Sequence, residues 1–286
     1  MSGSVPMAAD SYVLGTGREE RQRLREQHQL WLPRARSAWR RAGLGDGWRV
    51  LDLGAGPGDC SLELARRVGP AGRVLALEQS PAYVQECRAA AERAGLPWLE
   101  ARRHDLGAGP VAEGGFDLAW IRWVAMFLPT LEPLLALLQS CLRPGGQLVA
   151  HEYVHWQTFA LHPHGVAIAR FSDAVMASFR QAGGEPDVNR RLPGLLARRG
   201  FRIDELRPLP VLGRGGDPWA RWLERFVRIY GRALIRQGRW SPEDARQAEA
   251  EMGAARMRAG SYWVGPTVLE LRASAPAKPA QDTCRQ

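Results

Sequence analysis

Along residues 49 to 153, short apolar runs alternate with segments in which apolar residues have helical spacing. Four short apolar runs are typical of buried strands and lie at Arg49–Leu53, Arg73–Leu77, Phe116–Ile121 and Gln147–Glu152. Three segments with helical spacing separate them, at Ser61–Val68, Ala82–Ala94 and Leu131–Leu142. A weaker strand candidate, Trp98–Arg102, fits the same series. This alternation predicts an α/β fold of Rossmann-like type, with a parallel, doubly wound sheet.

The flanking segments add helices on both sides of this core. Apolar residues between Arg18 and Ala42 keep helical spacing and predict an N-terminal helical arm, which Pro33 is expected to break or kink. Downstream, helices are predicted near Pro163–Gln181, Pro193–Arg199 and Pro218–Arg258, and strands at Phe201–Leu209 and Thr267–Arg272. We therefore expect an arm (1–45), a core (46–210 and 264–274), a helical cap inserted between the last two strands (211–263) and a flexible tail (275–286).

Composition indicates an ordinary globular protein. The chain has 286 residues, of which 45% are hydrophobic and 24% are charged, so it does not have the composition of a disordered chain. No apolar stretch is long enough to cross a membrane, and the N-terminal residues lack a signal-peptide pattern. The four cysteines are scattered without a CxxC pair. These features predict a cytoplasmic protein with reduced thiols.

The net charge of +9 raises the question of a nucleic-acid partner. Almost all of the excess is arginine, since Lys278 is the only lysine. Such a one-sided choice, together with abundant Ala and Gly, is more typical of GC-rich coding than of a basic binding stripe. Nucleic-acid binding is therefore the less favoured interpretation.

A glycine-rich loop follows the first predicted strand and precedes a helix. Gly54, Gly56 and Gly58 allow close approach of a ligand, and the helix N-terminus offers unpaired N–H groups. The third glycine comes one position too early for the dinucleotide fingerprint, and Asp59 stands in its place. The loop thus indicates a nucleotide-like ligand other than NAD.

Acidic residues near the predicted strand ends restrict which ligand the loop can bind. Asp52 would repel a pyrophosphate but attract an ammonium and a sulfonium group, both of which S-adenosylmethionine (SAM) carries. Glu78 ends the second strand and can bind both ribose hydroxyls. Asp105 follows the third strand and can accept a hydrogen bond from an adenine amino group.

These motifs together resemble the class I SAM-dependent methyltransferases, and the arm resembles that of ubiquinone/menaquinone-type members. Asp52-Leu53-Gly54-Ala55-Gly56-Pro57-Gly58 matches the family's glycine loop, and His104-Asp105-Leu106 matches its adenine-binding turn. The resemblance implies a seven-stranded sheet, SAM as cofactor and S-adenosylhomocysteine (SAH) as product. It implies cofactor contacts from Asp52, Gly54, Ala55, Gly56, Gly58, Glu78, Gln79, Asp105, Leu106, Arg122 and Tyr12.

One motif points to a different chemistry. His151-Glu152-Tyr153-Val154-His155 reads as the HExxH zinc motif, which requires a helix to bring its two histidines together. Here the segment continues a predicted strand, where histidines four residues apart lie roughly 13 Å from each other. We expect no metalloprotease and no metal site, although His162 and His164 leave a different metal site open.

The same segment supplies the candidates for a catalytic base. Glu152 and His155 lie at the carboxyl end of a parallel strand, at the sheet edge where ligands bind. Aromatic residues gather nearby and near Trp219–Tyr230, either as core or as the wall of an apolar pocket. We predict methyl transfer to a small, partly apolar metabolite. An RNA or protein methyltransferase, a non-catalytic SAM-binding regulator and a NAD-linked oxidoreductase are the alternatives. The acceptor atom and the oligomeric state are not predicted.

Overall fold

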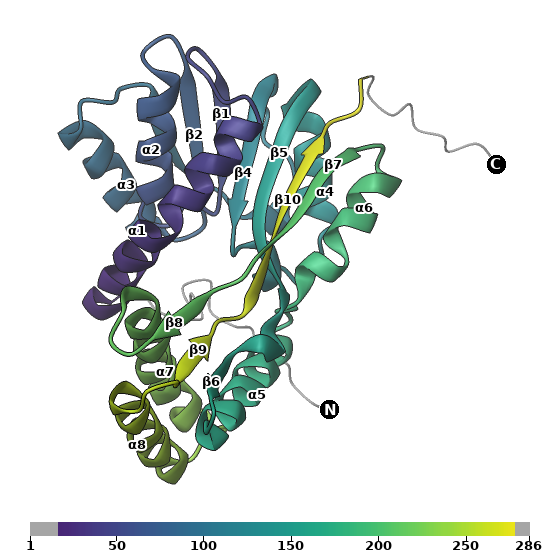
Figure 1. Cartoon of the computed structure of the whole chain (residues 1–286). Helices are drawn as coiled ribbons and strands as arrows, with labels where there is room; N and C mark the ends of the chain where they lie inside the picture. The colour runs from purple at the N-terminus through teal and green to yellow at the C-terminus, as the bar shows by residue number, and fades with distance from the viewer. Residues whose placement is uncertain (1–16, 278–286) are drawn as a thin grey trace, which may run out of the picture.

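A seven-stranded sheet forms the centre of the computed structural model, which describes residues 17–277 (Figure 1). The strand order is β3-β2-β1-β4-β5-β10-β7. Five strands are parallel: β1 (Arg49–Leu53), β2 (Arg73–Glu78), β3 (Leu99–Arg103), β4 (Phe116–Arg122) and β5 (Leu142–His155). The last strand, β10 (Thr267–Ser274), runs antiparallel to both β5 and β7 (Arg202–Leu209). Because the strand order reverses between β1 and β4, their following loops border a crevice.

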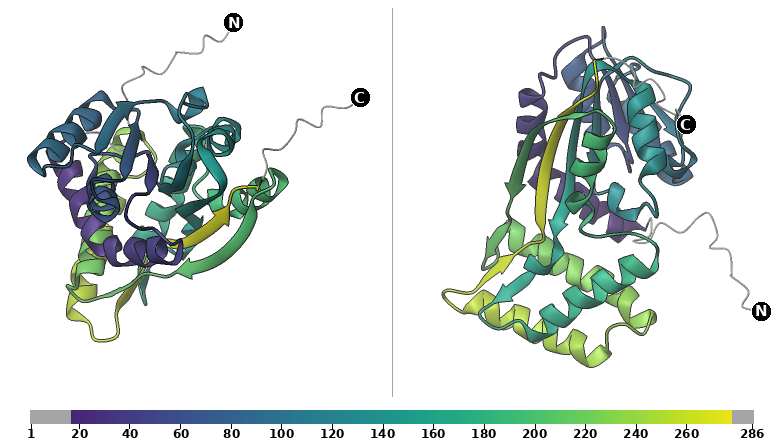
Figure 2. Two further views of the ribbon diagram at one scale, coloured as in Figure 1. Left: turned by 90° about the horizontal axis from the view of Figure 1, so that it is seen from above. Right: turned by 90° about the vertical axis from the view of Figure 1, so that its right-hand side faces the viewer.

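Helices cover both faces of this sheet, so the predicted fold and N-terminal arm are confirmed (Figure 2). Three helices share a buried cluster with Val50, Val74 and Val149: α1 (Arg18–Arg41), α2 (Asp59–Val68) and α3 (Pro81–Arg93). The alternate residues Leu51 and Leu53 pack in the other cluster, with the leucines of α4 (Glu132–Cys141) and α6 (Leu192–Arg198). Four short 3-10 helices complete the connections: η1 (Leu106–Ala108), η2 (Ala125–Phe127), η3 (Trp156–Thr158) and η4 (Val188–Arg190).

A cap lies beyond the carboxyl ends of the parallel strands (Figure 1). It consists of α5 (Val166–Gln181), α7 (Pro218–Arg236), α8 (Pro242–Met257) and a small antiparallel sheet of β6 (Ala160–His162), β9 (Tyr262–Val264) and β8 (Leu212–Arg214). The sequence predicted the helices but not the small sheet, whose three-residue strands are too short to show a period. It also did not predict that α5 and β6, which follow β5, pack with the inserted segment.

The arm helix α1 differs from expectation at Pro33, which does not break it. Pro33 is exposed, so the carbonyl that loses its helical partner can bind water instead. Trp31 and Ala35 on either side are fully buried and fix the helix against the protein. Within residues 17–277, no helix has the length and hydropathy needed to cross a membrane.

Trp31 joins the arm, the sheet and the cap. Its ring meets that of Trp123, after β4, edge-to-face at 5.0 Å, and that of Trp219, on α7, at 5.6 Å. The Arg34 guanidinium lies 4.6 Å from the Trp31 ring and 4.7 Å from the Trp219 ring. Three segments that are distant in sequence therefore share one aromatic cluster.

Trp31→Ala is expected to lower the free energy of unfolding by about 3 to 5 kcal/mol, because it leaves a cavity where three elements meet. Chemical denaturation checks this, with Met257→Ala as the control, since Met257 is 88% exposed. Equal stability of the two variants would contradict the role given to Trp31.

Candidate functional site

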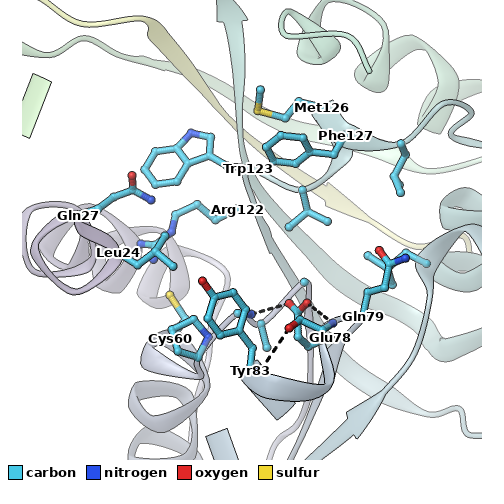
Figure 3. Close-up of a pocket in the computed structure, with 18 of the residues that line it drawn as sticks. Leu24, Gln27, Cys60, Glu78, Gln79, Tyr83, Arg122, Trp123, Met126 and Phe127 are labelled. Carbon is cyan, nitrogen blue, oxygen red and sulfur yellow. Dashed lines mark hydrogen bonds between the residues drawn. The ribbon is translucent and has the colours of Figure 1, made fainter. Parts of the chain in front are cut away.

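A cavity of about 920 Å³ lies between the carboxyl edge of the parallel strands and the cap. The loops after β1, β2 and β3 line one part, which we call the loop half. The other part, the aromatic half, is bordered by α1 and lined by the rings of Trp123, Phe127, Tyr153, Trp156, Trp222 and Phe226. Arg122, the last residue of β4, lies between the two halves (Figure 3).

The glycine loop uses its three glycines in different ways. All three have positive φ angles, of 69° at Gly54, 57° at Gly56 and 94° at Gly58. A Cβ atom at Gly54 would lie 2.3 Å from a methyl carbon of Val124, and one at Gly58 would lie 2.4 Å from the Cys87 sulfur. A Cβ atom at Gly56 would meet nothing within 4 Å. Gly54 and Gly58 therefore permit close packing, whereas Gly56 leaves the backbone open.

Glu78 connects this loop to the end of β2 (Figure 3). Its carboxylate accepts hydrogen bonds from the Gly56 and Ser80 backbone N–H groups, each at 2.8 Å. One bond falls on each oxygen, so each oxygen can accept another hydrogen bond. Gln79 is exposed beside it and also lines the cavity.

Asp52 lines the same half but is only 2% exposed. Its carboxylate accepts a hydrogen bond of 2.6 Å from the Ser61 hydroxyl on α2. Burial raises the pKa of Asp52 to about 6, against the opposing effects of the Ser61 hydrogen bond and the Arg122 charge. A cation in the cavity would favour the ionised carboxylate.

The turn after β3 completes the loop half. Asp105 accepts a hydrogen bond of 2.8 Å from the Gly107 N–H group and so caps η1, while Leu106 is buried. Every predicted cofactor residue in the described chain either lines the cavity or, like Gly58, packs directly beneath the loop that does. Tyr12 lies outside the described residues.

The turn after β4 shapes the aromatic half. Trp123 has a positive φ angle of 55°, which is unusual for a bulky residue. Its backbone N–H donates to the His151 carbonyl at 3.0 Å, and its ring stacks on that of Tyr153 at 5.7 Å. This geometry presents the indole to the cavity.

Glu152 and His155, the two predicted bases, do not line the cavity. The HExxH segment lies in β5 and is a strand, as predicted. His155 is exposed at the end of this strand, whereas His151 is buried, with its Nε2 atom 2.9 Å from a Glu270 carboxylate oxygen. The Glu152 carboxylate accepts hydrogen bonds from the Val124 and Ala125 N–H groups at 2.7 and 3.0 Å. It therefore holds the turn after β4.

Sequence reasoning missed Gln27, Arg23 and Tyr83, which also line the cavity. Gln27 and Arg23 lie on the inner face of α1, and Tyr83 lies in the first turn of α3. Helical spacing identified the inner face of the arm, but it could not predict that polar residues on that face would line a cavity.

The comparisons with known proteins agree with this geometry. Residues 50–146 match a family described as a methyltransferase domain. Demethylmenaquinone methyltransferase of Lactococcus lactis is 31% identical over 130 residues, covering 46% of this chain and 50% of that protein. Residues 50–146 are thus similar to a methyltransferase domain, which supports the resemblance to the class I SAM-dependent methyltransferases.

Two further similarities define how far this chain resembles known methyltransferases. 2-Phytyl-1,4-naphtoquinone methyltransferase of Synechococcus elongatus is 32% identical over 124 residues, covering 42% of this chain and 51% of that protein. The chain thus spans about half the length of these curated relatives. The structure of geranyl diphosphate C-methyltransferase from Streptomyces coelicolor A3(2) matches with a TM-score of 0.56 and 17% identity, over 93% of this chain and 89% of that one. That likeness shows the fold alone.

Replacing Glu152 separates its role in the turn from a role as base. Glu152→Gln is expected to fold like the parent, because an amide oxygen can accept both N–H groups, whereas Glu152→Ala should cost about 1 to 3 kcal/mol. Chemical denaturation and turnover of both variants check this. Turnover lost in the stable Gln variant would restore Glu152 as a base.

The pKa of Glu152 gives a second, pH-dependent prediction. Burial raises this pKa from 4.5 to about 7, so between these values the folded state keeps a proton that the unfolded state has lost. The contribution of Glu152 to stability is thus fully present below about pH 4.5 and is lost as pH rises to about 7. We expect the parent to lose stability relative to Glu152→Gln over this range in denaturation curves. A difference in free energy of unfolding between the two proteins that stays constant over this pH range would contradict the prediction.

Proposed function

We propose that the protein transfers the methyl group of SAM to a small, partly apolar acceptor. The observation that carries this proposal is the position of Glu78, whose carboxylate is fixed by Gly56 and Ser80 and lines a cavity that continues into the aromatic half. A cofactor and an acceptor can therefore share one cavity.

The residues of the loop half fit SAM. The free acceptor positions of Glu78 suit the ribose hydroxyls, and Asp105, Leu106 and Gln79 suit the adenine. Asp52 suits the cationic groups of the methionyl part. A buried guanidinium nitrogen of Arg122 has no hydrogen-bond partner among residues 17–277, which suits the carboxylate.

SAM supplies a methyl group that its sulfonium charge already activates. The task of this chain is then to orient the two molecules and to exclude water. The aromatic half, covered by the cap, supports a small acceptor over an RNA or a folded protein, which would need an open face. The quinone-related names of the two curated relatives support the same class of acceptor.

Calorimetric titration with SAM, SAH and NADH tests the cofactor. We expect SAM and SAH to bind, and Asp52→Ala and Glu78→Ala to weaken both by at least about tenfold, as for the loss of a charge-assisted contact. Asp46→Ala is the control, since the Asp46 side chain is 87% exposed. Binding of NADH without SAH would overturn the proposal in favour of an oxidoreductase.

A further inference from the structure

The polar groups that face the aromatic half include two unused hydrogen-bond donors. The first is the amide of Gln27, on α1 (Figure 3). Its oxygen accepts hydrogen bonds from Arg23 Nη1 at 2.7 Å and from Trp222 Nε1 at 3.3 Å. Because both partners are donors, this network fixes the amide orientation. The NH₂ group is left without a partner among the described residues, and the side chain lines the cavity.

The second donor is the hydroxyl of Tyr153, near the end of β5. Its ring is held between Trp123, stacked at 5.7 Å, and Trp156, edge-on at 5.2 Å. Within residues 17–277 the hydroxyl makes no hydrogen bond, although the residue is only 7% exposed and lines the cavity. A buried hydroxyl of this kind is stabilised by a ligand that accepts a hydrogen bond from it.

The charged groups near these donors are paired or lie at the border of the aromatic half. Arg23 lines it and is paired with the buried Glu20 carboxylate at 2.6 Å, and Arg122 borders it. The acidic residues that line the cavity all belong to the loop half. There Asp52 is bonded to Ser61, and Glu78 to Gly56 and Ser80. The Glu152 carboxylate is turned away, into the turn after β4. In the described chain, the residues that line the aromatic half thus offer hydrogen-bond donors but no carboxylate or imidazole to take a proton.

We infer that the acceptor binds in the aromatic half as an oxygen anion, such as an acidic enolate, phenolate or carboxylate, which the Gln27 amide and the Tyr153 hydroxyl hold by hydrogen bonds. This rests on the proposed function and specifies its substrate class. The acceptor loses its proton to solvent before it binds. Its electron pair then forms the bond to the methyl carbon of SAM, the carbon–sulfur bond breaks and its pair stays on sulfur, which gives SAH. The step needs no protein base.

The test compares binding of an anion with that of its neutral methyl ether. The probes are 2-hydroxy-1,4-naphthoquinone, a planar enol that is ionised at neutral pH, and 2-methoxy-1,4-naphthoquinone, of nearly the same shape. Binding to the SAH-loaded protein is followed by quenching of tryptophan fluorescence, since Trp123 and Trp222 line the cavity. We expect the anion to bind at least about tenfold more tightly, as for one hydrogen bond to a charged group.

Two variants locate the anion. Tyr153→Phe removes only the hydroxyl and should weaken binding of the anion roughly tenfold while leaving the ether unchanged. Gln27→Glu keeps an oxygen for Arg23 and Trp222 but replaces the free NH₂ group by an acceptor, so it should abolish the preference for the anion. Gln29→Glu makes the same change on the exposed side of α1 and is the matched control.

The outcomes separate this inference from the proposed function. SAH binding measured alone reports the loop half and does not depend on Gln27 or Tyr153. If SAH binds but the ether binds as tightly as the anion, or neither probe binds, the inference is wrong and the proposed function stands. Retention of the anion preference in both cavity variants would equally overturn it. If SAH itself does not bind, the proposed function fails.

Discussion

The cavity depends on the burial of one aromatic cluster, in which Trp31 of the arm meets Trp123 of the sheet and Trp219 of the cap. A sheet with helices on both faces needs no third lobe for its own stability, so the cap must be attached by its own contacts. Edge-to-face rings and a guanidinium between two indoles provide them. The arm therefore serves both as a covering helix of the sheet and as the link to the cap.

The turn after β4 connects the two halves of the cavity. Val124 packs so closely on Gly54 that no side chain could stand there, and the preceding Trp123 forms the wall of the aromatic half. Glu152 fixes both through the backbone of the turn. The two loops lie together because the strand order reverses between β1 and β4. A carboxylate outside the cavity can thus control the relative position of the two halves of the cavity.

Sequence reasoning predicted the sheet and its cofactor edge because both follow local rules. A strand followed by Gly54-Ala55-Gly56 and a helix can be read from neighbouring residues alone, and so can the acid that ends β2. The aromatic half could not be predicted in this way, since Gln27, Trp123, Tyr153 and Trp222 come from four distant segments. Adjacent residues of β5 point to opposite sides, so the sequence could not tell that Tyr153 rather than Glu152 lines the cavity.

Several arginines form ion pairs that join the arm to the rest of the molecule. Arg36 pairs with Glu63 at 2.5 Å and Arg25 with Glu86 at 3.3 Å, joining α1 to the core helices, while Arg225 pairs with Glu26 at 2.8 Å and Arg232 with Glu19 at 3.0 Å, joining α7 to α1. These pairs leave the net charge of +9 unchanged, because that value already counts every carboxylate. Exposed pairs of this kind contribute at most about 1 kcal/mol each. They orient the arm between core and cap, but the burial of Trp31 must supply most of the energy that holds it there.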